Sequence, residues 1–288
     1  MIISIASGKG GTGKTLVATS LTRSLKDKYD VQILDCDVEE PNDHIFLKGT
    51  VDGIDKVSIP VPAVDVAKCT CCGKCAEVCA YNAIAVLNQN VLVFPELCHG
   101  CGACGYLCPE GAITEVDREI GTVEYGNADG AAFVQGKLSI GQPMAPPIIR
   151  KVKSYAHHGG ITIIDAAPGS SCPVVEAIRG SDFCLLVTEP TPFGLNDLML
   201  AVETVKKLDI PFGIVLNRAG IGDGKTEDYC REQNIPILMT IPLDTRIAGY
   251  YSRGITLVDG MENYKESFLN MLYKIEEIAD EGSSSIKR

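Results

Sequence analysis

Eight cysteines in two matching quartets place the strongest constraint on how this chain can fold. The first quartet is Cys69, Cys72, Cys75 and Cys79, and the second is Cys98, Cys101, Cys104 and Cys108. Each member of the first quartet recurs 29 positions later, from 69 to 98 and so on to 79 and 108. A repeat this short and regular predicts two copies of one small unit packed against each other.

The composition supports metal ligation by these thiols. The chain has 13 cysteines, and it begins with an apolar run and a glycine-rich loop, so we expect no secretion signal. Dense cysteine in such a chain indicates metal ligands before disulfides. Zinc sites also use paired cysteines, but they seldom have three short spacings between cysteines in one run. Here such a run occurs twice, with the same spacings.

The quartets resemble the bacterial ferredoxin pattern, which binds two 4Fe–4S clusters. In that pattern three closely spaced thiolates come from one tight loop, and the fourth points away to the other cluster. The resemblance assigns Cys69, Cys72, Cys75 and Cys108 to cluster one. It assigns Cys79, Cys98, Cys101 and Cys104 to cluster two. Ala80 replaces the usual proline after the fourth cysteine, a change in loop shape and not in ligands.

A second motif predicts a phosphate site near the N-terminus. The P-loop pattern GKGGTGKT at residues 8–15 follows the apolar run Met1–Ala6 and precedes a predicted helix at Lys14–Lys26. Its glycines let backbone N–H groups point at phosphates, and the helix N-terminus adds positive charge. We expect Lys14 to bridge the outer phosphates of ATP and the Thr15 hydroxyl to bind Mg²⁺. The predicted nucleotide contacts from this segment are Gly8, Lys9, Gly10, Gly11, Thr12, Gly13, Lys14, Thr15 and Leu16.

The second lysine of the loop, Lys9, makes this variant resemble the MinD/ParA/nitrogenase iron protein family. The resemblance implies that Lys9 reaches across a dimer to the partner's nucleotide, which would couple hydrolysis to dimerisation. A homodimer is the default, and a heterodimer with a paralogue satisfies the same physics. The alternative is a Lys9 that acts within its own subunit. Leu16 departs from the family, which has Ser or Thr there, so a hydroxyl contact to the inner phosphate is lost.

Further residues fit the same resemblance. Asp37 matches the switch I aspartate that positions the attacking water, and it is a predicted magnesium ligand together with Thr15 and Asp165. Asp165 matches the Walker B position, with switch II expected at 166–169, whereas Asp35 is interpreted as structural. The predicted catalytic residues are Lys9, Lys14 and Asp37. The predicted adenine contacts are Asn217, Arg218 and the segment that begins at Pro242.

Apolar runs that alternate with helical segments predict the fold class: α/β, with a doubly wound, mainly parallel sheet. Strands are expected at Val31–Leu34, Ile161–Ile164, Phe183–Val187, Gly213–Leu216 and Ile237–Ile241. Helices are expected at Pro147–His157, Leu195–Leu208, Thr226–Gln233 and Glu262–Asp280, and hairpins within 116–138. The cysteine block reads as an inserted, small α+β ferredoxin-like domain. We place it at residues 60–118, inside an ATPase domain at 1–59 and 119–288.

Charge and hydropathy narrow the partners. The formal net charge is −11 with no basic run, which disfavours nucleic acid and anionic membrane surfaces. No apolar stretch approaches the roughly 18 residues of a spanning helix, so we expect a cytoplasmic protein. Cys172 is a weak candidate for a ligand shared between two subunits, because such a site needs a second cysteine. The other cysteines, Cys36, Cys71, Cys184 and Cys230, are expected as small apolar fillers.

Together these features predict an ATPase in which nucleotide state gates electron transfer through two 4Fe–4S clusters to a redox partner protein. The alternative is an ATP-dependent carrier that delivers a metal or an iron–sulfur cluster to another protein. A positioning ATPase with a structural cluster module is a third reading, and the lack of basic or membrane-binding features disfavours it.

Overall fold

The chain folds around a nine-stranded sheet in a computed structural model that describes residues 1–157 and 159–286. Its strands are β1 (Ile2–Ala6), β2 (Val31–Cys36), β3 (Gly49–Val64), β6 (Ile113–Ala128), β7 (Ala131–Leu138), β8 (Ile161–Ala166), β9 (Phe183–Thr188), β10 (Phe212–Ala219) and β11 (Ile237–Pro242). Their order in the sheet is β11-β10-β9-β1-β8-β2-β7-β6-β3. All neighbours from β11 to β7 pair in parallel, which confirms the predicted mainly parallel α/β class.

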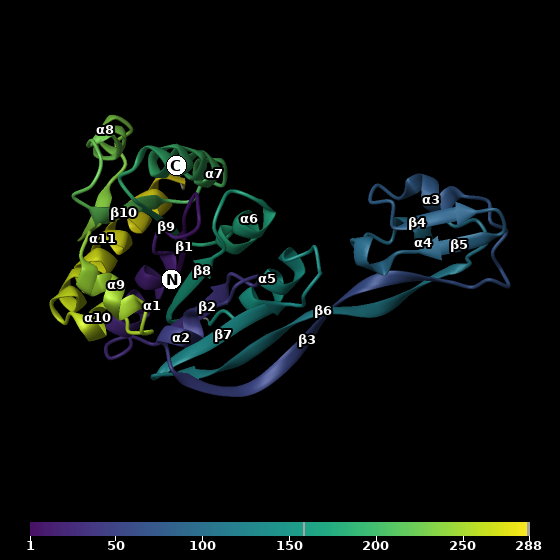
Figure 1. Cartoon of the computed structure of the whole chain (residues 1–288), viewed down its shortest axis with the longest axis horizontal. Helices are drawn as coiled ribbons and strands as arrows, with labels where there is room; N and C mark the ends of the chain where they lie inside the picture. Colours follow the sequence, from purple (N-terminus) through teal and green to yellow (C-terminus); the bar gives the residue numbers. More distant parts are fainter. Residues whose placement is uncertain (158, 287–288) are drawn as a thin grey trace.

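Helices cover both faces of the sheet (Figure 1). They are α1 (Lys14–Leu25), α2 (Asp43–Phe46), α5 (Pro146–Lys153), α6 (Cys172–Ile178), α7 (Pro192–Lys207), α8 (Lys225–Glu232), α9 (Thr245–Tyr251), α10 (Leu257–Gly260) and α11 (Asn263–Ile286). The predicted helices are present with shifted ends. The last one runs on to Ile286, beyond its expected end at Asp280, and Lys287 and Arg288 lie outside the described residues.

Two apolar cores lie on opposite faces of the sheet. Ile3 and Ile5 of β1 are fully buried with α1 and α11, whereas Ala6 is buried with α5, α6 and α7 on the other face. Successive residues of a strand point to opposite faces, so β1 contributes to both cores. A central strand buried on both sides is the reason for its continuous apolar sequence.

The sheet continues beyond β7 as a long antiparallel ribbon that the sequence did not predict. β3 and β6 have 16 residues each and pair along their whole length. The inner half of β6 also pairs with β7, in the hairpin expected within 116–138. The outer half pairs only with β3 and extends away from the body (Figure 1). The expected domain boundaries at 59/60 and 118/119 fall inside these two strands.

The ribbon ends in a small cysteine-rich module, which we define as residues 65–112. It contains α3 (Lys74–Val78), β4 (Ile84–Leu87), β5 (Asn90–Val93), the 3-10 turn η1 (Pro95–Leu97) and α4 (Ala103–Tyr106). The sequence repeat is also a backbone repeat. Left-handed residues occur in pairs 29 positions apart, at Cys71 and Gly100, Gly73 and Gly102, and Asn82 and Gly111.

Among residues 1–157 and 159–286, no helix has the length and apolar character needed to cross a lipid bilayer.

Candidate nucleotide and metal sites

Four neighbouring strands end at one edge of the sheet, and their ends form the candidate nucleotide site. In the order β9-β1-β8-β2, these ends carry Glu189, the P-loop, Asp165 and Asp37. The carboxyl ends of parallel strands are where open α/β sheets bind ligands. The fold therefore brings together residues that are far apart in the sequence.

Two glycines of the P-loop are required by close packing. A Cβ atom at Gly8 would lie 2.1 Å from the backbone oxygen of Asp197 in α7. Gly13 has a φ of 101°, and a Cβ there would lie 2.3 Å from Asn217 Nδ2. The side chain of Asn217 donates in turn to the carbonyl of Thr12 at 2.7 Å. Asn217 thus holds the loop in shape as well as lying beside the predicted base site.

The predicted magnesium ligands lie together at the start of α1. Thr15 Oγ1 donates to Asp165 Oδ2 at 2.7 Å, while Asp165 Oδ1 is buried without a hydrogen-bond partner. Asp37 stands at the end of β2, where burial raises its pKa and the nearby charge of Lys14 partly offsets that rise. Hydroxyl and carboxylate oxygens are the ligands that Mg²⁺ prefers, and an unpaired buried carboxylate oxygen leaves one free for it. The residues fit a magnesium ion.

Burial dominates the electrostatics of this edge. Burial raises the pKa of Asp165 to about 6, with the opposing charge of Lys14 and the Thr15 hydrogen bond lowering it. Burial likewise raises the pKa of Asp37 to about 6 against the charge of Lys14. Without nucleotide and metal, these carboxylates therefore lie in an environment that disfavours their charge.

Two more aspartates line the same region. Asp35 accepts backbone N–H bonds from Asp37, Asn42 and Asp43 at 3.1, 2.9 and 3.2 Å, in line with the structural interpretation of Asp35. Asp43 is completely buried, and its carboxyl group lies against that of Asp165. Burial and the Asp35 and Asp165 charges raise its pKa well above the usual range. The only sequence signal for Asp43 was its place at the end of the expected switch I region, around Asp37–Asp43.

Lys9 is held within its own subunit in this single chain. Its Nζ lies 2.5 Å from Glu189 Oε1, and Arg218 Nη1 lies 2.7 Å from Glu189 Oε2. Glu189 is 7% exposed, and nothing in the sequence analysis marked it. A signal was present, because Glu189 directly follows β9, the neighbour of the P-loop strand β1.

An open pocket lies beside the P-loop where the base of a nucleotide is expected. It contains the predicted contacts Leu16, Asn217, Arg218 and Pro242, together with Gly11, Gly13, Leu243, Asp244, Ile247, Ala248 and Tyr251. Tyr251 was not predicted, and its ring lies 4.7 Å from that of Phe46 at the end of α2. The base pocket therefore contacts the short helix that leads into β3.

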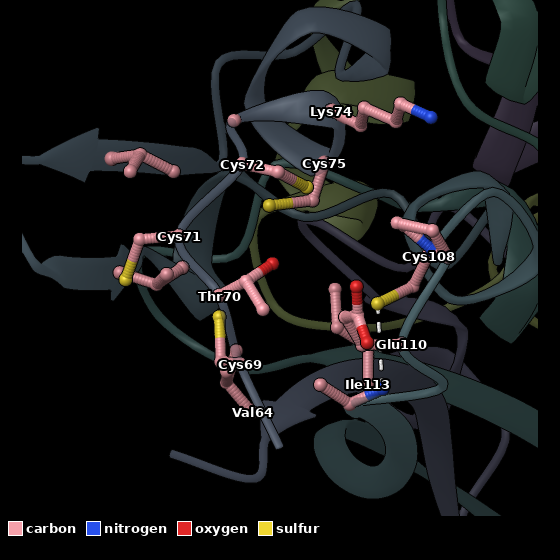
Figure 2. A pocket seen from close by; sticks show the side chains of 15 residues that line it. Val64, Cys69, Thr70, Cys71, Cys72, Lys74, Cys75, Cys108, Glu110 and Ile113 are labelled. Carbon is pink, nitrogen blue, oxygen red and sulfur yellow. Dashed lines mark hydrogen bonds between the residues drawn. The ribbon is translucent and has the colours of Figure 1, made fainter. Parts of the chain in front are cut away.

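The cysteine-rich module contains two separate pockets, and each is lined by one of the expected crossed quartets. Cys69, Cys72, Cys75 and Cys108 line the first. Cys79, Cys98, Cys101 and Cys104 line the second. In Figure 2 the sulfur atoms of Cys72 and Cys75 lie near each other, and those of Cys69 and Cys108 lie below them and apart from one another. Cys71 also lines this pocket, and its thiol lies near that of Cys69.

Backbone N–H groups surround these sulfurs in a repeated way. Ala83 N donates to Cys79 Sγ at 3.2 Å, and Ala112 N donates to Cys108 Sγ at 3.3 Å, again 29 positions apart. Gly100 N donates to Cys98 Sγ at 3.4 Å. Hydrogen bonds to sulfur tune bound iron–sulfur clusters. The donor set therefore fits thiolate ligation.

The remaining cysteines divide by burial. Cys36, Cys184 and Cys230 are buried among apolar side chains, as expected for fillers, and burial raises the pKa of each. Cys172 is exposed at the start of α6. Cys71 is only half-buried and takes a left-handed φ of 56°, at the position where the second repeat has Gly100, so it differs from the expected filler.

With its fold and site defined, the chain belongs to the CobQ/CobB/MinD/ParA nucleotide binding domain family, whose model matches residues 3–258. Uncharacterized protein MJ0579 from Methanocaldococcus jannaschii is 34% identical over 94% of this chain and 97% of its own length. An iron–sulfur cluster carrier protein from Pyrococcus horikoshii is 23% identical over 97% of this chain and 88% of its own. The septum site-determining protein MinD from Pyrococcus horikoshii, solved with Mg-ADP, has the same fold. It has a TM-score of 0.60 and 20% identity over 98% of both chains.

Proposed function

We propose that this protein is an ATP-hydrolysing iron–sulfur protein that carries two 4Fe–4S clusters in its cysteine-rich module and links their use to nucleotide state. The observation that carries the proposal is the division of eight thiols between two pockets. Each pocket receives three cysteines from one sequence motif and the fourth from the other. This is the crossed arrangement of two-cluster ferredoxins.

The sequence pattern of the thiols favours clusters over zinc, because zinc sites seldom have three short spacings between cysteines in one run, and here such a run occurs twice in register. When bound, such clusters transfer one electron at a time.

The nucleotide half of the proposal rests on the strand-end geometry. Lys14 neutralises the outer phosphates, while Thr15, Asp37 and Asp165 hold Mg²⁺. Asp37 positions the attacking water, and Lys9 stabilises charge at the opposite site of a dimer. The dimer is of two identical chains or of this chain with a paralogue.

A continuous stretch of chain connects the two sites. Asp37 closes β2, Asp43 begins α2, and β3 starts at Gly49 and runs without interruption to Val64, near the first cysteine ligand. A nucleotide shifts such a segment only if it binds one conformation more tightly than another. Mg²⁺ binding would reduce the repulsion among the buried carboxylates beside α2. It would therefore favour one conformation of the stretch from Asp37 to Val64.

Two uses of the clusters remain distinct. The carrier function, in which a cluster is delivered to another protein, gains support from relatives that bear the name iron–sulfur cluster carrier protein. It therefore takes precedence over gated electron transfer, the use favoured by the sequence analysis. Electron transfer keeps one specific support, because each quartet is complete within a single chain.

A transfer assay separates these two functions. The protein is loaded with ⁵⁵Fe-labelled clusters under anaerobic conditions and mixed with an excess of an apo-ferredoxin acceptor, with and without Mg-ATP. A carrier loses label to the acceptor in a nucleotide-dependent way. Retention of all label, together with nucleotide-dependent reduction of a redox dye by protein whose clusters were first reduced with dithionite, establishes electron transfer instead. If neither quartet binds iron, the whole proposal is contradicted.

A further inference from the structure

We propose that Glu189 is an intramolecular latch that holds Lys9 in its own subunit until Mg-ATP and a second subunit compete for that lysine. The latch is seen directly as the contact of Lys9 Nζ with Glu189 Oε1 at 2.5 Å. The inference rests on the proposed function only in its last step, where the released lysine acts across a dimer.

The carboxylate is positioned from several sides. Glu189 directly follows β9, and the Thr191 hydroxyl, which caps α7, also reaches Oε1 at 3.3 Å. Burial alone would raise the pKa of Glu189, but the Lys9 and Arg218 partners bring it below its usual value. Glu189 is therefore a charged acceptor fixed in place by the fold, whereas the Lys9 side chain, 30% exposed, is the movable partner.

Arg218 makes the release of Lys9 feasible. It binds the other oxygen, Oε2, at 2.7 Å, so Glu189 stays paired with a cation when Lys9 leaves. A buried carboxylate that lost its only partner would strongly oppose release. Lysine is a point charge on a flexible stem, whereas arginine binds carboxylates through a planar fork. Here Arg218 makes a single contact through Nη1 and its side chain is 46% exposed, so its part is to keep Glu189 neutralised when Lys9 leaves.

The latch lies where a nucleotide can act on it. Lys9 belongs to the phosphate loop, and Arg218 lines the base pocket in a left-handed conformation with φ of 54°. ATP phosphates offer Lys9 a stronger negative charge than one carboxylate. A bound base would restrict Arg218, which keeps Glu189 neutralised. Both effects favour release of Lys9 when nucleotide is bound.

The first test measures Lys9 in the isolated, nucleotide-free protein. Trace acetylation followed by mass spectrometry gives the labelling rate of Lys9 relative to Lys56, an exposed lysine paired with Glu119 on the distant ribbon. We expect Glu189→Gln to raise the Lys9 rate several-fold and to leave Lys56 unchanged. Glu124→Gln, which removes the comparable Lys137 pair at 2.8 Å, is the matched control and should change neither rate. An unchanged Lys9 rate in Glu189→Gln overturns the latch.

The second test measures self-association by analytical ultracentrifugation with Mg-ATP and a non-hydrolysable analogue. We expect Glu189→Gln to lower the dimer Kd about 5- to 10-fold, within the usual range of coupling between sites. The same substitution in a Lys9→Ala background should have no effect, because the latch acts only through Lys9. A weaker or unchanged dimer in Glu189→Gln, or an equal effect in both backgrounds, overturns the proposal. Faster Lys9 labelling with no dimer in any variant leaves the latch standing and refutes the dimer in the proposed function.

Discussion

The buried Asp165 gives a prediction whose size follows from the structure. This carboxylate is 1% exposed, and its pKa is raised from 3.8 to about 6, chiefly by burial. A difference of about 2 pKa units corresponds to about 3 kcal/mol, at roughly 1.4 kcal/mol per unit. Because the folded state holds this proton more tightly than the unfolded chain, stability is greatest at low pH. It falls as the pH rises from about 4 to about 6.

We therefore expect Asp165→Asn to stabilise the nucleotide-free protein. At pH 7.5 the free energy of unfolding should rise by up to about 3 kcal/mol, and at pH 4.5 by only about 1 kcal/mol. The asparagine carbonyl can still accept the Thr15 hydrogen bond. With saturating Mg-ATP the wild type should become more stable than Asp165→Asn, because only the native carboxylate binds the metal. At 1,000 times Kd, ligand binding stabilises the wild type by about 4.1 kcal/mol, which exceeds the gain of about 3 kcal/mol expected for the variant.

The assay is anaerobic urea unfolding followed by circular dichroism at both pH values, with and without Mg-ATP. Asp27→Asn is the control, because Asp27 is exposed and its pKa is lowered by the hydrogen bond and charge of Lys265, so its loss should not stabilise the protein. A nucleotide-free Asp165→Asn protein that is less stable than wild type at pH 7.5 would refute the reasoning. So would a stability difference that is equal at the two pH values.

Two further predictions concern the cluster ligands and the P-loop. Replacing Cys79 by Ser should abolish cluster two, and replacing Cys75 should abolish cluster one; either change lowers iron from roughly eight to roughly four atoms per chain. Loss of the same cluster in both variants, seen by EPR and iron analysis, would exclude crossed ligation. Gly13→Ala should abolish ATP binding measured by calorimetry, because its Cβ would clash with Asn217. Gly11→Ala, with φ of 77° but open space around its Cβ, should reduce stability by only about 1–2 kcal/mol and keep measurable binding, and equal losses in the two variants would contradict this packing account.

The features that could be predicted from sequence are those whose geometry is local. The P-loop needs its glycines, lysine and threonine within eight positions between a strand and a helix, so the pattern implies the structure. The cysteine quartets likewise encode their own loops, and the 29-residue repeat reappears in the left-handed backbone positions. Continuous apolar strands separated by helices were enough to predict the mainly parallel sheet.

The ribbon escaped prediction because its strands are stabilised by distant partners. β3 contains Pro60 and Pro62, which usually argue against a strand, and it is tolerated because it lies at the edge of the sheet. Its pairing with β6 joins residues as far apart as Gly49 and Ala128. The Lys9–Glu189 contact is of the same kind, because 180 positions separate its two residues. No local pattern specifies such a pair.

The central claim is that nucleotide state acts on two clusters held at the end of the ribbon. The most direct measurement is EPR of the anaerobically reduced protein, with and without Mg-ATP, in the wild type and in Lys14→Ala. We predict signals from two interacting 4Fe–4S clusters, altered by Mg-ATP in the wild type and unaltered in the variant. Spectra that show no cluster signal, or that are identical with and without Mg-ATP in the wild type, would contradict it.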